Sequence, residues 1–110
     1  MMVSDQRNLL AQHLFELEAQ MRQLKVWEAE PPSQQALAST QPFAVDTLSF
    51  NQWLQFVFIA KMEILLQQGL PLPESCELLP MAEEAFQPLG ADALPLLHTI
   101  DNIDALFASN

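Results

Sequence analysis

Hydrophobic residues are densest between residues 50 and 68, where they would cover most of the circumference of a helix. This stretch contains neither glycine nor proline. A helix that is apolar on nearly every side is normally buried among its neighbours. We therefore expect a central apolar helix over about 50–68, with the rest of the chain packed around it. Its apolar positions are Trp53, Leu54, Phe56, Val57, Phe58, Ile59, Ala60, Met62, Ile64, Leu65 and Leu66.

Both ends of this stretch carry residues that begin or end helices. Ser49 can cap the N-terminus, and Gln52 three residues later completes a capping-box pattern. Gly69 can adopt the left-handed conformation that ends a helix, and Pro71 prevents continuation. The longest unbroken apolar run, 56–60, is far shorter than the ~20 apolar residues of a membrane-spanning helix. The pattern thus predicts a core helix and no membrane span.

A regular apolar stripe marks the first helix, which we expect over about 5–27. The stripe has steps of four and three residues, the spacing of a coiled-coil seam. It is too short to favour a coiled-coil dimer over packing within one chain, so we expect it to face the chain's own core. The stripe consists of Leu10, Leu14, Leu17, Met21 and Leu24.

Two more helices are expected near the C-terminus, over about 79–87 and about 92–107. In the shorter one we expect Met81, Ala85 and Phe86 to face inward, and the two glutamates between them to face outward. The longer one would begin at an Asp92 N-cap. Its apolar face consists of Leu96, Leu97, Ile100, Ile103, Leu106 and Phe107. The chain therefore reads as all-α: a compact bundle of four helices in a single domain, 1–110.

A long loop, about 29–48, separates the first two helices. Loops of more than about 12–15 residues without regular structure are uncommon in compact domains and are often functional. We expect Phe43 and Val45 to fix this loop to the core. Two interpretations remain open: a structural crossover, or a recognition loop.

Charge excludes several kinds of partner. The chain has 14 acidic and 4 basic residues, a formal net charge of −10, and no Lys or Arg after Lys61. Nucleic acids and anionic membranes would be repelled, because binding them requires positive charge. One cysteine and no secretion-signal pattern at the N-terminus favour the cytoplasm.

Few residues suggest chemistry. His13 with Glu16, and His98 with Asp101, are spaced by three residues on two expected helices, but the order is the reverse of the Glu-x-x-His pairs of bundle metal sites. Cys76 is flanked by glutamates, which raise a thiol pKa and so oppose nucleophilic reactivity. No glycine-rich phosphate loop is present. We expect no catalytic residues, no metal and no cofactor.

Aromatic residues are numerous for a small bundle. One face of the central helix would then be incompletely covered, and uncovered aromatic patches usually bind a partner or ligand. The large rings are Trp27, Phe43, Phe50, Trp53, Phe56, Phe58, Phe86 and Phe107.

Several segments together resemble the YqcC-like family of small bacterial proteins. They are residues 39–43, 46–48, 53–59, 61–62 and 106–107. The resemblance covers nearly the whole chain and implies a compact, all-helical domain. The family is largely uncharacterised. It is sometimes labelled tRNA pseudouridine synthase C, the enzyme whose genes neighbour those of the family in many bacteria. Such an enzyme needs a catalytic Asp in a β-rich fold and a basic RNA surface, and neither is readable here.

The resemblance implies no catalytic residues. Within it, Thr40, Gln41, Pro42, Phe43 and Trp53 are the candidates for an interaction surface, while structural anchoring of the loop is the explanation that we favour for them. Our first hypothesis is a non-enzymatic accessory protein, monomer or weak homodimer, that binds another protein such as a tRNA pseudouridine synthase. The second is a small apolar-ligand carrier with a pocket beside the central helix. The third is an enzyme of unrecognised type.

Overall fold

The structure, a computed structural model, describes residues 5–108. Regular structure within these residues is helical, and no strand is present among them. The predicted all-α fold is confirmed. In chain order the elements are α1 (Asp5–Gln23), α2 (Gln34–Leu37), η2 (Pro42–Ala44), α3 (Phe50–Trp53), η3 (Leu54–Ile59), α4 (Ala60–Gln67), α5 (Leu79–Ala85), η4 (Gln87–Ala93) and α6 (Leu94–Ala108).

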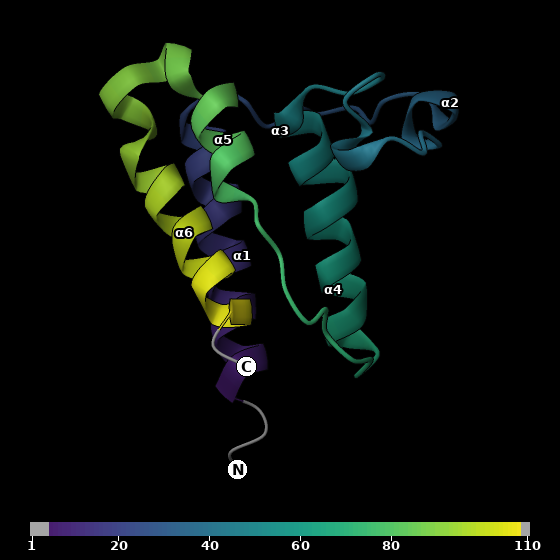
Figure 1. The fold of residues 1–110 in the computed structure, drawn as a ribbon, viewed down its shortest axis with the longest axis vertical. Coiled ribbons are helices and arrows are strands. Elements are labelled where there is room, and N and C mark those ends of the chain that lie inside the picture. The colour runs from purple at the N-terminus through teal and green to yellow at the C-terminus, as the bar shows by residue number, and fades with distance from the viewer. Residues whose placement is uncertain (1–4, 109–110) are drawn as a thin grey trace.

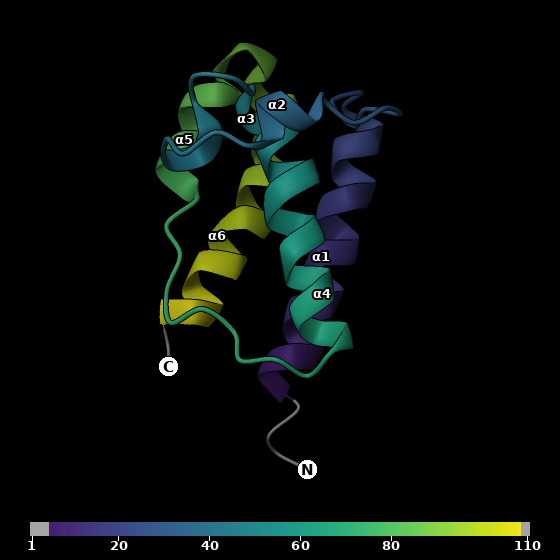
Figure 2. The same cartoon turned by 90° about the vertical axis from the view of Figure 1, so that its right-hand side faces the viewer.

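The helices form two groups. α1 and α6 pack against each other most extensively, and α5 packs on α6 (Figure 1). The elements α3, η3 and α4 form one continuous helix, residues 50–67, which stands to one side of this group (Figure 1). An extended linker, residues 70–78, returns from the end of α4 to the start of α5 (Figure 2).

Helix 50–67 begins and ends as predicted. The Ser49 hydroxyl accepts a hydrogen bond from the Gln52 N–H at 3.3 Å, and the Gln52 Oε1 accepts one from the Ser49 N–H at 3.0 Å. This is the predicted capping box. Gly69 has a φ of 67°, the predicted left-handed end. The sequence did not predict that the middle segment, η3, is a π-helix. Such segments are rare and frequently lie at functional sites.

The expectation that helix 50–67 is enclosed on all sides is wrong. Its buried residues share one face, while Ile64 is 49% exposed. Most of the fully buried large side chains belong to α1 and α6, and helix 50–67 adds Leu54 and Met62 to the core from one side. Helix 50–67 is only partly covered because α5 is short and the linker is a single extended segment. The buried residues of helix 50–67 are Phe50, Leu54, Gln55, Phe58, Ile59 and Met62.

Several polar contacts attach helix 50–67 to the N-terminal part of the chain, including those of Asn51 with Val26 and of Gln52 with Glu28. The Arg7 guanidinium donates to the backbone carbonyls of Leu65, at 2.6 Å, and Leu70, at 2.9 Å. The buried Gln55 amide pairs with the backbone of Glu28: Nε2 donates to the carbonyl and Oε1 accepts from the N–H, both at 2.9 Å. Buried polar groups are costly unless they are paired in this way.

The first helix ends four residues earlier than predicted. α1 ends at Gln23, because Lys25 adopts a left-handed conformation with a φ of 65°. The Val26 N–H then donates to the Met21 carbonyl at 3.0 Å, closing the helix end. Trp27 therefore lies beyond the helix. The predicted apolar stripe is confirmed within the helix, since Leu10, Leu14, Leu17 and Met21 are buried, whereas Leu24 lies beyond the helix and is partly buried.

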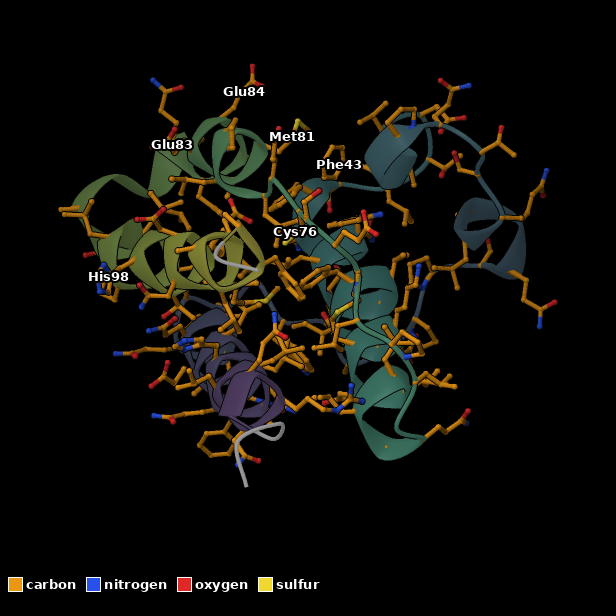
Figure 3. The ribbon with its side chains drawn as sticks, turned by 60° about the horizontal axis from the view of Figure 1, so that its bottom comes forward. Phe43, Cys76, Met81, Glu83, Glu84 and His98 are labelled. Carbon is orange, nitrogen blue, oxygen red and sulfur yellow. The ribbon has the colours of Figure 1, made fainter. Side chains whose placement is uncertain are left out.

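The C-terminal helices differ from the prediction in detail. α5 buries Ala82, and Phe86 directly after it is also buried. Of the other residues expected to face inward, Met81 is partly buried against the core, whereas Ala85 is exposed. Glu83 and Glu84 project outward as predicted (Figure 3). The last helix starts at Leu94 and not at 92, because the 3₁₀ segment η4 occupies the residues before it.

The loop over 29–48 has short structure of its own. The Thr47 hydroxyl donates to the Ala36 carbonyl at 2.7 Å, which joins the C-terminal end of the loop to α2. Val45, expected to face the core, is 57% exposed, and its neighbour Ala44 is buried instead. In the described part of the chain, no helix combines the length and the apolar character needed to cross a membrane.

Candidate functional site: an apolar pocket beside helix 50–67

A half-open pocket of about 270 Å³ lies between helix 50–67 and the linker 70–78. One wall is the helix, the other is the linker, and the loop contributes one aromatic ring. Most of its lining is apolar. The lining residues are Phe43, Trp53, Val57, Phe58, Lys61, Met62, Pro73, Ser75, Cys76, Glu77 and Leu78.

The aromatic end of the pocket is held by ring contacts. The Phe43 ring meets Trp53 edge-on, with ring centroids 4.8 Å apart. Trp53 also stacks on Phe58 at 5.9 Å and on Phe50 at 5.8 Å. Each such pair contributes about 0.5–1.5 kcal/mol beyond the burial of its area. This end of the pocket is therefore rigid before anything binds.

Phe43 reaches this position through an unusual backbone turn. Phe43 and Ala44 both have left-handed conformations, with φ values of 56° and 51°. This conformation costs a residue with a Cβ roughly 1–2 kcal/mol. The Ala44 N–H donates to the Gln41 carbonyl at 2.9 Å, and the Leu48 N–H donates to the Ala44 carbonyl at 2.9 Å. The loop thus keeps a strained turn that places an aromatic ring in the pocket wall, and strain of this kind concentrates at functional sites.

The linker wall is fixed by one carboxylate on α6. Asp104 accepts hydrogen bonds from the backbone N–H groups of Leu78, at 2.9 Å, and Leu79, at 2.8 Å. Its Oδ1 lies 3.4 Å from the Cys76 Sγ, which donates to it. The carboxylate satisfies N–H groups at the start of α5 that have no partner within the helix.

The surroundings of Cys76 oppose nucleophilic reactivity. Burial, followed by the charge of Asp104 and the hydrogen bond to it, raises the thiol pKa from 9.0 to about 12. A thiol with such a pKa carries almost no thiolate near neutral pH. The sequence predicted the direction of this shift but attributed it to the flanking glutamates.

The predicted interaction residues fall into two groups. Phe43 and Trp53 are half-buried and meet in the pocket wall, whereas Thr40, Gln41 and Pro42 are exposed on the loop that leads to it. The structure therefore brings together the two aromatic residues. That these five residues bind a partner stays a prediction.

Sequence reasoning missed the linker wall, formed by 73–78. Linker length could have revealed it. Nine extended residues span about 30 Å, close to the ~27 Å of an 18-residue helix. A linker of this length can run back along the whole helix, which places its side chains opposite Val57 and Lys61.

The histidine pairs do not come together. The His13 Nδ1 lies 3.2 Å from the Glu16 Oε1 on α1, and His98 is exposed on α6, well away from the Phe43 end of the pocket (Figure 3). Across residues 5–108, no group of three or more His, Cys, Asp or Glu side chains is placed to hold a metal ion.

Comparison with known proteins identifies the family. Residues 9–106 match the family DUF446, described as "tRNA pseudouridine synthase C". The solved solution structure of the protein YqcC from Escherichia coli aligns with a TM-score of 0.79 and 33% identity, over 94% of this chain and 87% of that chain. The chain belongs to the YqcC-like family. Its predicted family is thus confirmed.

Two relatives of similar length bear names that state no function. A Haemophilus influenzae protein is 43% identical over 81 residues, covering 74% of this chain and 76% of that protein. The "Uncharacterized protein YqcC" of E. coli K12 is 35% identical over 94 residues, covering 86% of each chain.

A third relative differs in length. A "tRNA pseudouridine synthase C" of Pectobacterium carotovorum subsp. carotovorum is 41% identical over 68 residues, which are 62% of this chain and 18% of that protein. More than four-fifths of that longer protein therefore has no counterpart in this YqcC-like chain.

Proposed function

We propose that this YqcC-like chain is a non-enzymatic, cytoplasmic interaction module that accompanies a tRNA pseudouridine synthase. The observation that carries the proposal is the Pectobacterium relative. There, a segment similar to this chain makes up 18% of a protein that bears the synthase name. Joining of an accessory segment to an enzyme in one polypeptide suggests that the two work side by side when they are separate chains.

The chemistry of the pocket supports a binding role. Its lining is mostly hydrocarbon, and its one thiol, Cys76, has a pKa of about 12. The charge of the chain supports a protein partner with a basic surface. An enzyme that acts on tRNA needs positive charge to hold phosphates. A chain with a net charge of −10 is attracted to such a surface.

The test is direct association of the two purified proteins. The purified chain and the tRNA pseudouridine synthase C of the same bacterium are mixed and analysed by sedimentation velocity. We expect a complex that weakens as salt rises from about 50 to about 300 mM, because screening reduces attraction between opposite charges. Absence of a complex at the lower salt concentration contradicts the proposal. A complex insensitive to salt contradicts the electrostatic part of it.

A small apolar ligand is the second candidate. It is favoured by the position of the pocket beside helix 50–67 and by its apolar lining. The volume of about 270 Å³ is just below the roughly 300–1,000 Å³ of ordinary ligand sites. Native mass spectrometry of the chain purified from its own bacterium tests this candidate. A bound molecule of defined mass, lost in a Val57→Asp variant, would favour it over the protein partner.

A further inference from the structure

We propose that the pocket beside helix 50–67 receives one large apolar side chain of a partner protein, in a segment that carries Lys or Arg next to that side chain. This inference deepens the proposed interaction role and rests on it. It adds where the partner docks and what the docking segment is made of.

The size of the pocket favours a side chain as the occupant. At about 270 Å³ it is too small for a whole helix but large enough for one bulky residue. Binding energy in protein interfaces concentrates in such buried anchors, which are usually aromatic or large aliphatic residues set in a preformed pocket. The contacting rings of Phe43, Trp53 and Phe58, edge-on for the first pair and stacked for the second, provide a preformed apolar end for such an anchor.

Charge at the rim favours basic residues beside the anchor. Glu77 lines the pocket, and both it and Glu74 are exposed on the linker wall. The ion pairs within residues 5–108 involve only residues of α1, so neither glutamate is paired with a cation in that part of the chain. Beyond Lys61 the sequence contains no Lys or Arg. Lys61 lies on the opposite wall and forms no ion pair with either glutamate in the described chain, so the negative charge of the linker wall is open to a cation of another molecule.

Lys61 gives the site a direction. It lines the helix wall, opposite the glutamates of the linker wall. A partner segment that places its cation toward Glu77 meets attraction, whereas the reversed orientation places that cation near Lys61 and is repelled. The same charges disfavour a second copy of this chain as occupant, because two molecules with a net charge of −10 repel each other.

The loop residues beside the pocket are also exposed and can contact a partner. Pro42 is exposed and Val45 is 57% exposed, and both flank Phe43 on the loop. A partner whose anchor enters the pocket would cover this apolar rim as well, and the predicted surface residues Thr40 and Gln41 lie next to it.

Site-specific photocrosslinking in the bacterium that encodes the chain tests the inference. The photoreactive residue p-benzoylphenylalanine replaces the half-buried Val57 in the pocket or, as a control, Phe15, which is 76% exposed on α1 outside the pocket. Crosslinked peptides of the partner are then sequenced by mass spectrometry. We expect crosslinks from position 57 to a segment in which a large apolar residue lies within about four residues of Lys or Arg, the reach of one helical turn.

Charge reversal provides the matched variants. Glu77→Lys should lower the yield of this crosslink at least about fivefold, because it turns attraction at the rim into repulsion. Glu83→Lys, an equal change on an exposed residue of α5 that does not line the pocket, should leave the yield unchanged. Circular dichroism melting of the two charge-reversal variants, compared with the chain that carries neither, checks that both variants are folded.

Several results would overturn the inference: no crosslink from position 57, a crosslink to a second copy of the chain, a captured segment without Lys or Arg, or equal losses for the two charge reversals. A basic, apolar segment of a protein other than the synthase would support the docking mode and overturn the synthase association. A complex with the synthase in sedimentation, without crosslinks from position 57, would support the synthase association and overturn the docking mode.

Discussion

Lys25 has a backbone conformation that glycine usually provides. The same turn ends two helices in this protein: the Val26 N–H reaches the Met21 carbonyl at 3.0 Å after α1, and the Leu70 N–H reaches the Leu65 carbonyl at 2.9 Å after α4. At the second turn the left-handed residue is Gly69. At the first it is a lysine with a φ of 65°, which costs roughly 1–2 kcal/mol relative to glycine in the folded state.

Lys25→Gly should therefore stabilise the fold. Glycine loses more chain entropy on folding, which offsets part of the gain, so we expect the free energy of unfolding to rise by about 0.5–1 kcal/mol. Urea denaturation measures the change. Lys25→Ala is the matched control, since alanine lacks the lysine side chain but retains the Cβ. If the alanine variant is as stable as the glycine variant, the effect comes from the side chain and the backbone argument fails.

The limits of sequence reasoning are clearest at single residues. The sequence predicted the capping box of Ser49 and Gln52 and the helix end at Gly69, because each involves only residues that are close together in the chain. Asp104, by contrast, caps the start of α5 from 26 residues away. No periodic pattern records such a contact. The left-handed turn at Phe43 was equally unpredictable, because its neighbours are ordinary loop residues.

At the scale of elements, periodicity predicted the stripe of α1 but overestimated the burial of helix 50–67. The pattern showed that this helix is apolar on nearly every side. It did not show how much of the remaining chain packs against the helix. The extended linker covers one flank, held at its far end by Asp104 and Leu78. The resulting gap is the pocket, which the surplus of aromatic residues had indicated only in general terms.

The anchoring of the linker to α6 can be tested through Cys76. Asp104→Asn removes the negative charge but keeps an acceptor oxygen for the N–H groups of Leu78 and Leu79. Since that charge and its hydrogen bond both raise the thiol pKa, now about 12, the pKa should fall in the variant. Burial is the largest cause of the shift and remains. The rate of iodoacetamide alkylation as a function of pH should move to lower pH.

Stability provides the control for that experiment. Asp104→Ala removes the acceptor as well, and loss of a helix cap should lower the free energy of unfolding by about 0.5–2 kcal/mol. The asparagine variant should lose much less. Equal losses in both variants, or an alkylation profile that does not move in the asparagine variant, would contradict the role given to the carboxylate.

At the scale of the whole molecule, few polar contacts hold helix 50–67 to the α1–α6 pair. Arg7 is prominent among them, because it binds two carbonyls at the end of α4, those of Leu65 and Leu70. Arg7→Gln should cost about 1.5–3 kcal/mol, the range for hydrogen bonds to charged groups. It should also speed amide hydrogen exchange at residues 66–70, where the chain turns into the linker.

Arg22→Gln is the matched control for Arg7. Its guanidinium is exposed and pairs with Glu18 one turn away at 2.9 Å, a surface contact worth about 0.2–1 kcal/mol. Hydrogen exchange followed by mass spectrometry, together with urea denaturation, separates the two variants. If Arg22→Gln is as harmful as Arg7→Gln, the tether between α1 and α4 has no special role.

The positions of the first and last helices, α1 and α6, determine how the chain can be attached to a surface or to another domain. α1 begins and α6 ends at the same end of the molecule, while α2 and the start of α3 lie at the other end (Figure 1). The loop that follows α2 also lies at that other end, and it contains η2, the segment of Phe43. A chain attached to a sensor surface by either terminus would therefore present its aromatic loop to the solution, and a reporter domain fused at either terminus would leave that loop unobstructed.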